Sequence, residues 1–230
     1  MLIHGFQTLT LVDFPGRVAS ILFTGCCDFR CPYCQNAALV LHPESEGVYS
    51  DEEIFSYLEK RRKMLDGVVM SGGEPTLHKD LPGYLARIKD LGLEVKLDSN
   101  GNRPEALRSL VEKGLVDYIA MDVKNSLSRY GETVGRSGMD TSAVKESISY
   151  LLGRPVEYEF RTTVVHELHD DSSFEDISEL CRGADAYYLQ CFVASGHTIS
   201  QGLTPPSPED LSRYAGILSR TISSVQIRDR

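Results

Sequence analysis

Residues 18–34 read VASILFTGCCDFRCPYC, a strand-like run that leads directly into four cysteines. Residues 18–24 are rich in β-branched and aromatic side chains, which is typical of a buried strand. The cysteines that follow are Cys26, Cys27, Cys31 and Cys34. Ligands of parallel α/β sheets bind beyond the carboxyl ends of the strands. This stretch therefore predicts a functional loop at the end of the first strand.

The rest of the chain alternates between further strand-like runs and amphipathic helical stretches. Six βα units predict an α/β fold, a parallel sheet with outer helices. A closed eightfold barrel needs about 250 residues, so we expect a partial (β/α)6 TIM-like barrel. Without an internal linker, residues 1–230 are expected to form a single domain. The later strands are predicted over residues 68–70, 93–97, 118–123, 156–165, 187–192 and 225–227. The helices are predicted after Ser50, over 81–91, 104–113, 141–152 and 174–181, and after Ser207. The helix after Ser50 is predicted to carry Ile54, Leu58 and Leu65 along one side.

Composition limits the class of protein. The 230 residues carry 24 Lys and Arg against 33 Asp and Glu, a formal net charge of −9. This balance argues against nucleic acid as a partner, because such binding needs cations to displace phosphate counterions. We expect no membrane partner, because the longest apolar run is far below the roughly 20 residues of a spanning helix. The start of the chain lacks the pattern of a secretory signal, so a cytoplasmic location is expected.

In a reducing cytoplasm, clustered cysteines indicate metal or redox chemistry more often than disulfides. Cys27, Cys31 and Cys34 have the spacing C-x3-C-x2-C. Three thiolates at this spacing can hold three corners of an iron–sulfur cubane and leave one iron open for chemistry. The alternative is a zinc knuckle with Cys26 or a distant histidine as the fourth ligand. Zinc sites usually show a second matched pair, and none of the six histidines has that spacing. Cys181 lies in a helical pattern, which favours a buried structural thiol.

Glycine and polar residues follow the next three predicted strands as well. Because the carboxyl ends of parallel strands share one rim, these segments predict a single site. They are Ser71, Gly72, Gly73 and Glu74, then Asp98, Ser99 and Asn100, then Asp122 and Lys124.

Together, the cysteine spacing and the segment Ser71-Gly72-Gly73-Glu74-Pro75 resemble radical S-adenosylmethionine (SAM) enzymes. The resemblance implies a [4Fe-4S] cluster held by Cys27, Cys31 and Cys34. It also implies SAM held by the backbone and glutamate of the Gly-Gly-Glu motif, with Tyr33 near the adenine. In this family, reductive cleavage of SAM yields a 5′-deoxyadenosyl radical. The alternative for Tyr33 is simple loop packing.

Residues 5–16, GFQTLTLVDFPG, resemble the start of glycyl-radical-enzyme activating proteins. The Asp-Phe-Pro-Gly segment is closest to those that activate anaerobic ribonucleoside-triphosphate reductase, whereas pyruvate formate-lyase activases favour Asp-Gly-Pro-Gly. The resemblance implies a glycyl radical enzyme as protein substrate and flavodoxin or ferredoxin as electron donor. The alternatives are a pyruvate formate-lyase-type activase, a radical SAM enzyme acting on a small molecule, as in 7-carboxy-7-deazaguanine synthesis, and a non-catalytic iron–sulfur or zinc protein.

Similarity to the activases assigns further roles. The segment Asp98-Ser99-Asn100 would lie beside SAM, where relatives also bind a monovalent cation. Asp122 and Lys124 would face the cavity, and Arg161 would lie near the SAM ribose or carboxylate. The alternatives are an Asx turn before Gly101 for Asp98 and solvated charges for Lys124 and Arg161. Relatives have glycine where this chain has Cys26, so we predict Cys27 as the cluster ligand.

Overall fold

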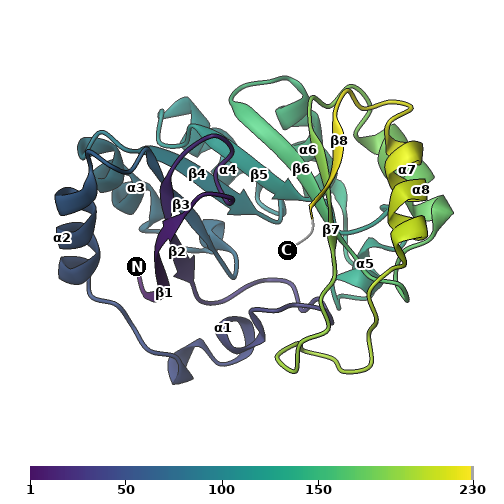
Figure 1. Ribbon diagram of the computed structural model, residues 1–230, viewed down its shortest axis with the longest axis horizontal. Helices are drawn as coiled ribbons and strands as arrows, with labels where there is room; N and C mark the ends of the chain where they lie inside the picture. The colour runs from purple at the N-terminus through teal and green to yellow at the C-terminus, as the bar shows by residue number, and fades with distance from the viewer. Residues whose placement is uncertain (229–230) are drawn as a thin grey trace. The chain divides into compact units, whose positions relative to one another are not determined.

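The computed structural model describes residues 1–228, and the chain forms two compact units. The first unit contains residues 1–28, 36–99 and 105–119, and the second contains residues 29–35, 100–104 and those from 120 onward. Strand β5 (Tyr118–Asp122) begins in the first unit and ends in the second. The hydrogen-bonded strand order, β1 to β8, follows the order of the chain (Figure 1).

The first unit contains three parallel strands and one antiparallel edge strand. Gly67 pairs with Ala19 on one side and with Glu94 on the other, which fixes the parallel register. The antiparallel strand β1 was not among the predicted strands. It is an edge strand whose sequence, IHGFQTLT, mixes glycine and polar residues, so the chain shows no apolar run there. The strands are β1 (Ile3–Thr10), β2 (Ala19–Thr24), β3 (Gly67–Gly72) and β4 (Glu94–Ser99).

Local capping decides where the helices of this unit begin and end. Ser50 and Glu53 form a reciprocal capping box at the start of α2. Gly92 follows α3 with a φ of +78°, the left-handed conformation that glycine adopts without strain. Leu65, predicted on the same face as Ile54, instead follows the helix and is buried in the connection. The elements are α1 (Ala37–Leu41), η1 (Pro43–Ser45), α2 (Asp51–Arg61), η2 (Pro75–Leu77), α3 (Leu81–Asp90) and α4 (Pro104–Glu112).

The second unit continues the parallel pattern. Tyr187 pairs with Phe160 on one side and with Val225 on the other. Helices α7 and α8 lie side by side (Figure 1), and the Phe174 ring stacks on the Tyr214 ring with centroids 4.3 Å apart. The elements are β6 (Glu157–Val164), β7 (Tyr187–Cys191), β8 (Val225–Arg228), α5 (Tyr130–Thr133), α6 (Ser142–Leu152), α7 (Asp171–Leu180) and α8 (Pro208–Leu218).

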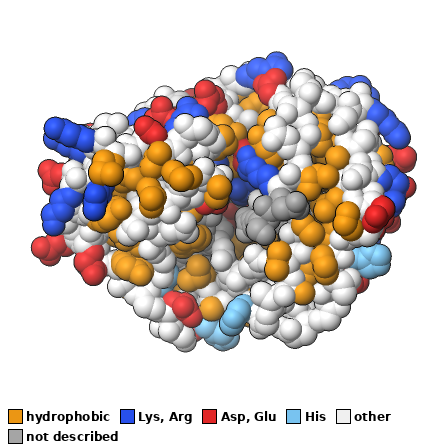
Figure 2. All heavy atoms as spheres, in the orientation of Figure 1, with side chains coloured by type: hydrophobic (Ala, Val, Ile, Leu, Met, Phe, Trp, Pro, Cys, Tyr) orange, Lys and Arg blue, Asp and Glu red, His pale blue; other side chains and the backbone are white. Residues whose placement is uncertain are grey.

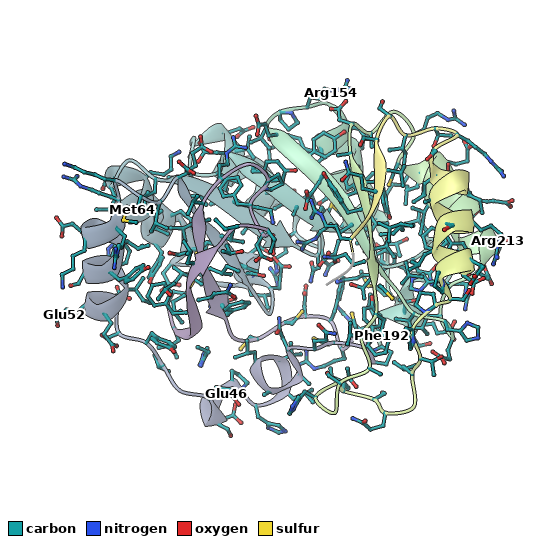
Figure 3. The ribbon with its side chains drawn as sticks, viewed as in Figure 1. Glu46, Glu52, Met64, Arg154, Phe192 and Arg213 are labelled. Carbon is teal, nitrogen blue, oxygen red and sulfur yellow. The ribbon has the colours of Figure 1, made fainter. Side chains whose placement is uncertain are left out.

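A surface ion pair adds a second contact between α7 and α8. Arg213, labelled on α8 in Figure 3, donates to Asp171 of α7 at 2.8 Å and also to Asp210 of its own helix at 2.6 Å. On the face shown in Figure 2, acidic and basic side chains are interspersed. No helix within residues 1–228 has both the length and the apolar character needed to cross a bilayer.

The predicted fold class is confirmed: the protein is an α/β protein with a mostly parallel sheet. Each predicted strand is present, and each predicted helix is present within a few residues of its expected bounds. Cys181 caps the end of α7 as a fully buried free thiol, and burial raises its pKa. This environment agrees with the structural role predicted for it.

Candidate functional site

The Gly-Gly-Glu segment follows β3 and presses directly against the end of β2. Gly72 has a φ of +114°, and a Cβ there would lie 2.3 Å from the backbone N and O of Thr24. A Cβ on Gly73 would lie 1.8 Å from the carbonyl oxygen of Cys26. Only glycine permits this approach of one backbone to the other, which explains both glycines of the motif.

Hydrogen bonds hold the same two segments together. The Gly73 N–H donates to the Thr24 carbonyl, and the Glu74 N–H donates to the Cys26 carbonyl, both at 2.8 Å. Two side chains missed by sequence reasoning complete the contact. The Asn36 amide donates to the Gly72 carbonyl at 2.9 Å, and His78 Nε2 lies 3.0 Å from the Gly25 carbonyl. The segment that enters the cysteine loop is therefore fixed from several sides.

Glu74 is fully buried, and its carboxylate braces its own loop. Oε1 accepts hydrogen bonds from the Thr76 N–H at 3.1 Å, the Thr76 hydroxyl at 2.5 Å and the Ser99 hydroxyl at 3.1 Å. The Ser99 contact joins the end of β4 to the loop after β3. Among the predicted residues, the structure thus brings Glu74 and Ser99 together within the first unit.

Asp98 forms a second link between β3 and β4. Its Oδ2 accepts a hydrogen bond from the Ser71 hydroxyl at 2.9 Å, and its Oδ1 accepts one from the Lys96 ammonium at 2.6 Å. Asn100 makes an Asx turn, in which its Oδ1 accepts from the Asn102 N–H at 2.9 Å. Sequence reasoning missed Lys96; the available signal was a lysine inside a strand predicted to be buried.

The remainder of the cysteine loop, residues 29–35, belongs to the second unit. The Cys34 N–H donates to the Cys31 carbonyl at 3.0 Å and closes a turn. The Arg30 N–H donates to the Val134 carbonyl, and the Pro32 carbonyl accepts from the Ser200 N–H, both at 2.8 Å. These contacts anchor Cys31 and Cys34 to the second unit.

A buried ionic cluster forms between the end of β5 and the middle of β6. Asp122 pairs with Arg161 at 3.0 Å and with Lys124 at 3.1 Å. Burial raises the pKa of Asp122, but the charges of Arg161 and Lys124 outweigh it and hold that pKa well below its usual range. Burial lowers the pKa of Lys124, yet the Asp122 carboxylate reverses the effect and raises it above its usual value. All three groups therefore stay charged at neutral pH. The side chains of Lys124 and Arg161 are largely buried, so they are not solvated surface charges.

Cys31 and Tyr33 are both buried and interact with this ionic cluster. Burial raises the pKa of the Cys31 thiol to about 11, although the Lys124 charge opposes the shift. The Tyr33 hydroxyl is buried beside the Cys31 thiol, and its interaction with that thiol partly opposes the rise in the Cys31 pKa.

The chemistry of the predicted donors suits an iron–sulfur cluster, because such clusters are held by cysteine thiolates. Cys27, Cys31 and Cys34 are all free thiols. Cys27 belongs to the first unit and the other two belong to the second. No three His, Cys, Asp or Glu side chains within residues 1–228 converge on a metal site. Binding would require Cys31 as a thiolate, and metal coordination supplies the charge that offsets its raised pKa.

The chain is similar to known proteins over most of its length. The chain matches the model of the Radical SAM superfamily over residues 21–181. It is 32% identical to a Methanocaldococcus jannaschii protein named "Putative glycyl-radical enzyme activating enzyme", over 99% of this chain and 95% of that protein. It is 33% identical to the pyruvate formate-lyase-activating enzyme of Staphylococcus aureus, over 54% of this chain and 53% of that enzyme.

Solved structures share the fold at low sequence identity. Streptococcus suis SuiB bound to S-adenosylmethionine superposes with a TM-score of 0.67 at 14% identity, over 91% of this chain and 51% of SuiB. A domain of a pyruvate-formate lyase-activating enzyme from Bacteroides vulgatus superposes with a TM-score of 0.57 at 19% identity. That match covers 70% of this chain and 98% of the domain.

Proposed function

Because the chain belongs to the radical SAM superfamily, we propose that it activates a glycyl radical enzyme by removing a hydrogen atom from one glycine Cα of that partner. The observation that carries the proposal is the match to the M. jannaschii protein, which extends over 99% of this chain. A match of that extent spans both units and all the loops that contain the predicted site residues.

The cofactors of the superfamily are a [4Fe-4S] cluster and SAM. In our proposal Cys27, Cys31 and Cys34 hold three irons of the cluster. When bound, the cluster supplies the electron that cleaves SAM and so generates the hydrogen-abstracting 5′-deoxyadenosyl radical. The Gly-Gly-Glu segment would hold SAM through its backbone. Glu74 would act as a positioning residue, because its carboxylate is hydrogen-bonded within the loop.

The ionic cluster of the second unit would contact SAM. Asp122 pairs with both Lys124 and Arg161, so the three side chains hold one another in place. We propose that Asp122 and Lys124 face the SAM cavity and that Arg161 lies near the SAM ribose. Tyr33 would lie near the adenine.

The test is spectroscopic. The protein is reconstituted anaerobically with iron and sulfide, reduced, and mixed with SAM and a purified glycyl radical enzyme. We expect 5′-deoxyadenosine and a glycyl doublet in the electron paramagnetic resonance spectrum of the partner. Formation of 5′-deoxyadenosine without a doublet on any partner would favour the small-molecule alternative. Absence of both products would contradict the proposal.

The partner is proposed to be anaerobic ribonucleoside-triphosphate reductase, on the strength of Asp13-Phe14-Pro15-Gly16, and the electron donor flavodoxin or ferredoxin. The match to the S. aureus pyruvate formate-lyase-activating enzyme favours a second candidate, pyruvate formate-lyase. The same assay distinguishes them when each partner is offered separately at equal concentration. The partner that gains the glycyl doublet is the substrate.

A further inference from the structure

Lys96 is a buried lysine in the middle of β4, two residues before Asp98, which lies near the carboxyl end of that strand. Its side chain is 1% exposed, and its ammonium donates to Asp98 Oδ1 at 2.6 Å. Asp98 is held in turn by the Ser71 hydroxyl, which donates to Oδ2 at 2.9 Å. An ammonium group is costly to bury, so such a lysine persists only where its charge is compensated.

The ammonium of Lys96 has more hydrogen-bond donors than the Asp98 carboxylate uses. It carries three N–H bonds, and among the described residues only the Asp98 carboxylate accepts one of them. At 1% exposure, water has little access to the other two. Buried donors without acceptors carry a penalty, which a bound ligand with anionic oxygens would remove.

The surroundings of Lys96 place those donors close to the Gly-Gly-Glu loop. Ser71 begins the segment that contains Gly72, Gly73 and Glu74, and it contacts Asp98 directly. Ser99, which follows Asp98 at the end of β4, donates a hydrogen bond from its hydroxyl to the Glu74 carboxylate at 3.1 Å. All of these residues belong to the first unit, so the arrangement depends on a single compact body.

We propose that Lys96 is a built-in cation. Its ammonium neutralises Asp98 and donates a hydrogen bond to the carboxylate of bound SAM. The ammonium thereby replaces the bound monovalent cation that the sequence resemblance implies. The inference rests on the proposed function only in taking SAM as the ligand.

A tethered ammonium differs from a dissolved ion in one measurable way. A bound potassium ion is governed by mass action, so ligand affinity would depend on its concentration. A lysine is present at every salt composition, and it already occupies an oxygen of Asp98. SAM affinity of this protein should therefore be independent of whether potassium or a bulky organic cation is present.

The experiment measures the dissociation constant of radiolabelled SAM by equilibrium dialysis against the reconstituted holoprotein, without a partner enzyme. Buffers contain potassium chloride or tetramethylammonium chloride at equal ionic strength. We expect the same dissociation constant for the wild type in both. For Lys96→Met in tetramethylammonium we expect binding about tenfold weaker, as for loss of one hydrogen bond from a charged donor, with recovery in potassium.

Lys89→Met is the matched control. Lys89 also forms a lysine–aspartate pair in the first unit, 2.6 Å from Asp117, but on α3. It should bind SAM as the wild type does in both salts. Thermal unfolding monitored by circular dichroism establishes that each variant is folded, and Lys96→Arg tests whether charge alone preserves cation independence.

A wild type whose SAM affinity falls about tenfold when potassium is replaced would overturn the proposal. A folded Lys96→Met that keeps wild-type affinity in both salts would overturn it as well. If Lys96→Met does not fold, the wild-type salt comparison can still overturn the proposal. Cation-independent SAM binding by a protein that yields no glycyl radical would contradict only the activase function.

Discussion

The carbonyl oxygen of Cys26 accepts a hydrogen bond from the Glu74 N–H at 2.8 Å, which ties the cysteine loop to the Gly-Gly-Glu loop through backbone atoms alone. Gly73 lies between them, with no room for a side chain. The position of the predicted cluster ligand Cys27 therefore depends on a residue 46 positions later in the chain. Glycine at position 73 is required by the packing of two backbones.

Gly73→Ala tests this dependence. A Cβ would lie 1.8 Å from the Cys26 carbonyl oxygen, so one of the two loops must move. We expect reduced iron incorporation and weaker SAM binding, measured by iron and sulfide analysis and by dialysis. Gly83→Ala is the control, because a Cβ there meets nothing within 4 Å. Full iron content in a folded Gly73→Ala would contradict the structural account.

The two adjacent cysteines should behave oppositely. Cys27→Ala is expected to lose the cluster, whereas Cys26→Gly is expected to keep it. Cys26 has a φ of +62°, so its Cβ is strained and glycine should stabilise the fold by about 1 kcal/mol. Iron content after anaerobic reconstitution and urea unfolding provide the two measurements. A complete cluster in Cys27→Ala would make Cys26 the ligand.

Removal of Arg228 should destabilise the protein strongly. Its guanidinium donates to both oxygens of Glu159 at 3.0 and 2.9 Å, and Glu159 is fully buried. Arg228→Met removes both of these charge-assisted hydrogen bonds to a buried carboxylate, with an expected cost of about 3 kcal/mol in the free energy of unfolding. Arg182→Met, which breaks an exposed pair with Glu179, should cost less than about 1 kcal/mol. Urea unfolding measures both costs. Equal losses of unfolding free energy in Arg228→Met and Arg182→Met would contradict the difference expected between a buried and an exposed pair.

His169 should make stability depend on pH. Burial lowers its pKa below the ordinary value of 6.5, although the backbone carbonyls of Lys124 and Val165 partly oppose the shift. The folded state thus disfavours the protonated ring, whereas the unfolded state takes up a proton near pH 6.5. The contribution of His169 to the free energy of unfolding is complete above pH 6.5 and falls as the pH drops below that value.

His169→Gln removes this titration. The free energy of unfolding of the wild type should decline more steeply between pH 7 and pH 5 than that of the variant. Urea unfolding at a series of pH values measures both slopes. Parallel slopes for the two proteins would show that His169 titrates equally in the folded and unfolded states.

Most of the fold could be predicted because its signals are local. The Ser50 and Ser207 caps, the glycine that ends α3 and the apolar runs of the parallel strands each depend on a few neighbouring residues. β1 escaped prediction because an edge strand needs no continuous apolar run. The end of α2 was overestimated because Leu65 is buried by the connection that follows the helix.

The sequence by itself determined the chemistry that is available: three cysteines at a fixed spacing, two adjacent glycines, and charged residues after strands. These features are encoded within short segments. The tertiary structure alone decided which charges meet. Arg161 reaches Asp122 because β6 lies beside β5, and Lys96 shares Asp98 with Ser71 because β4 lies beside β3. Such pairs depend on strand register, which arises from packing across the whole sheet and is not encoded in any one segment.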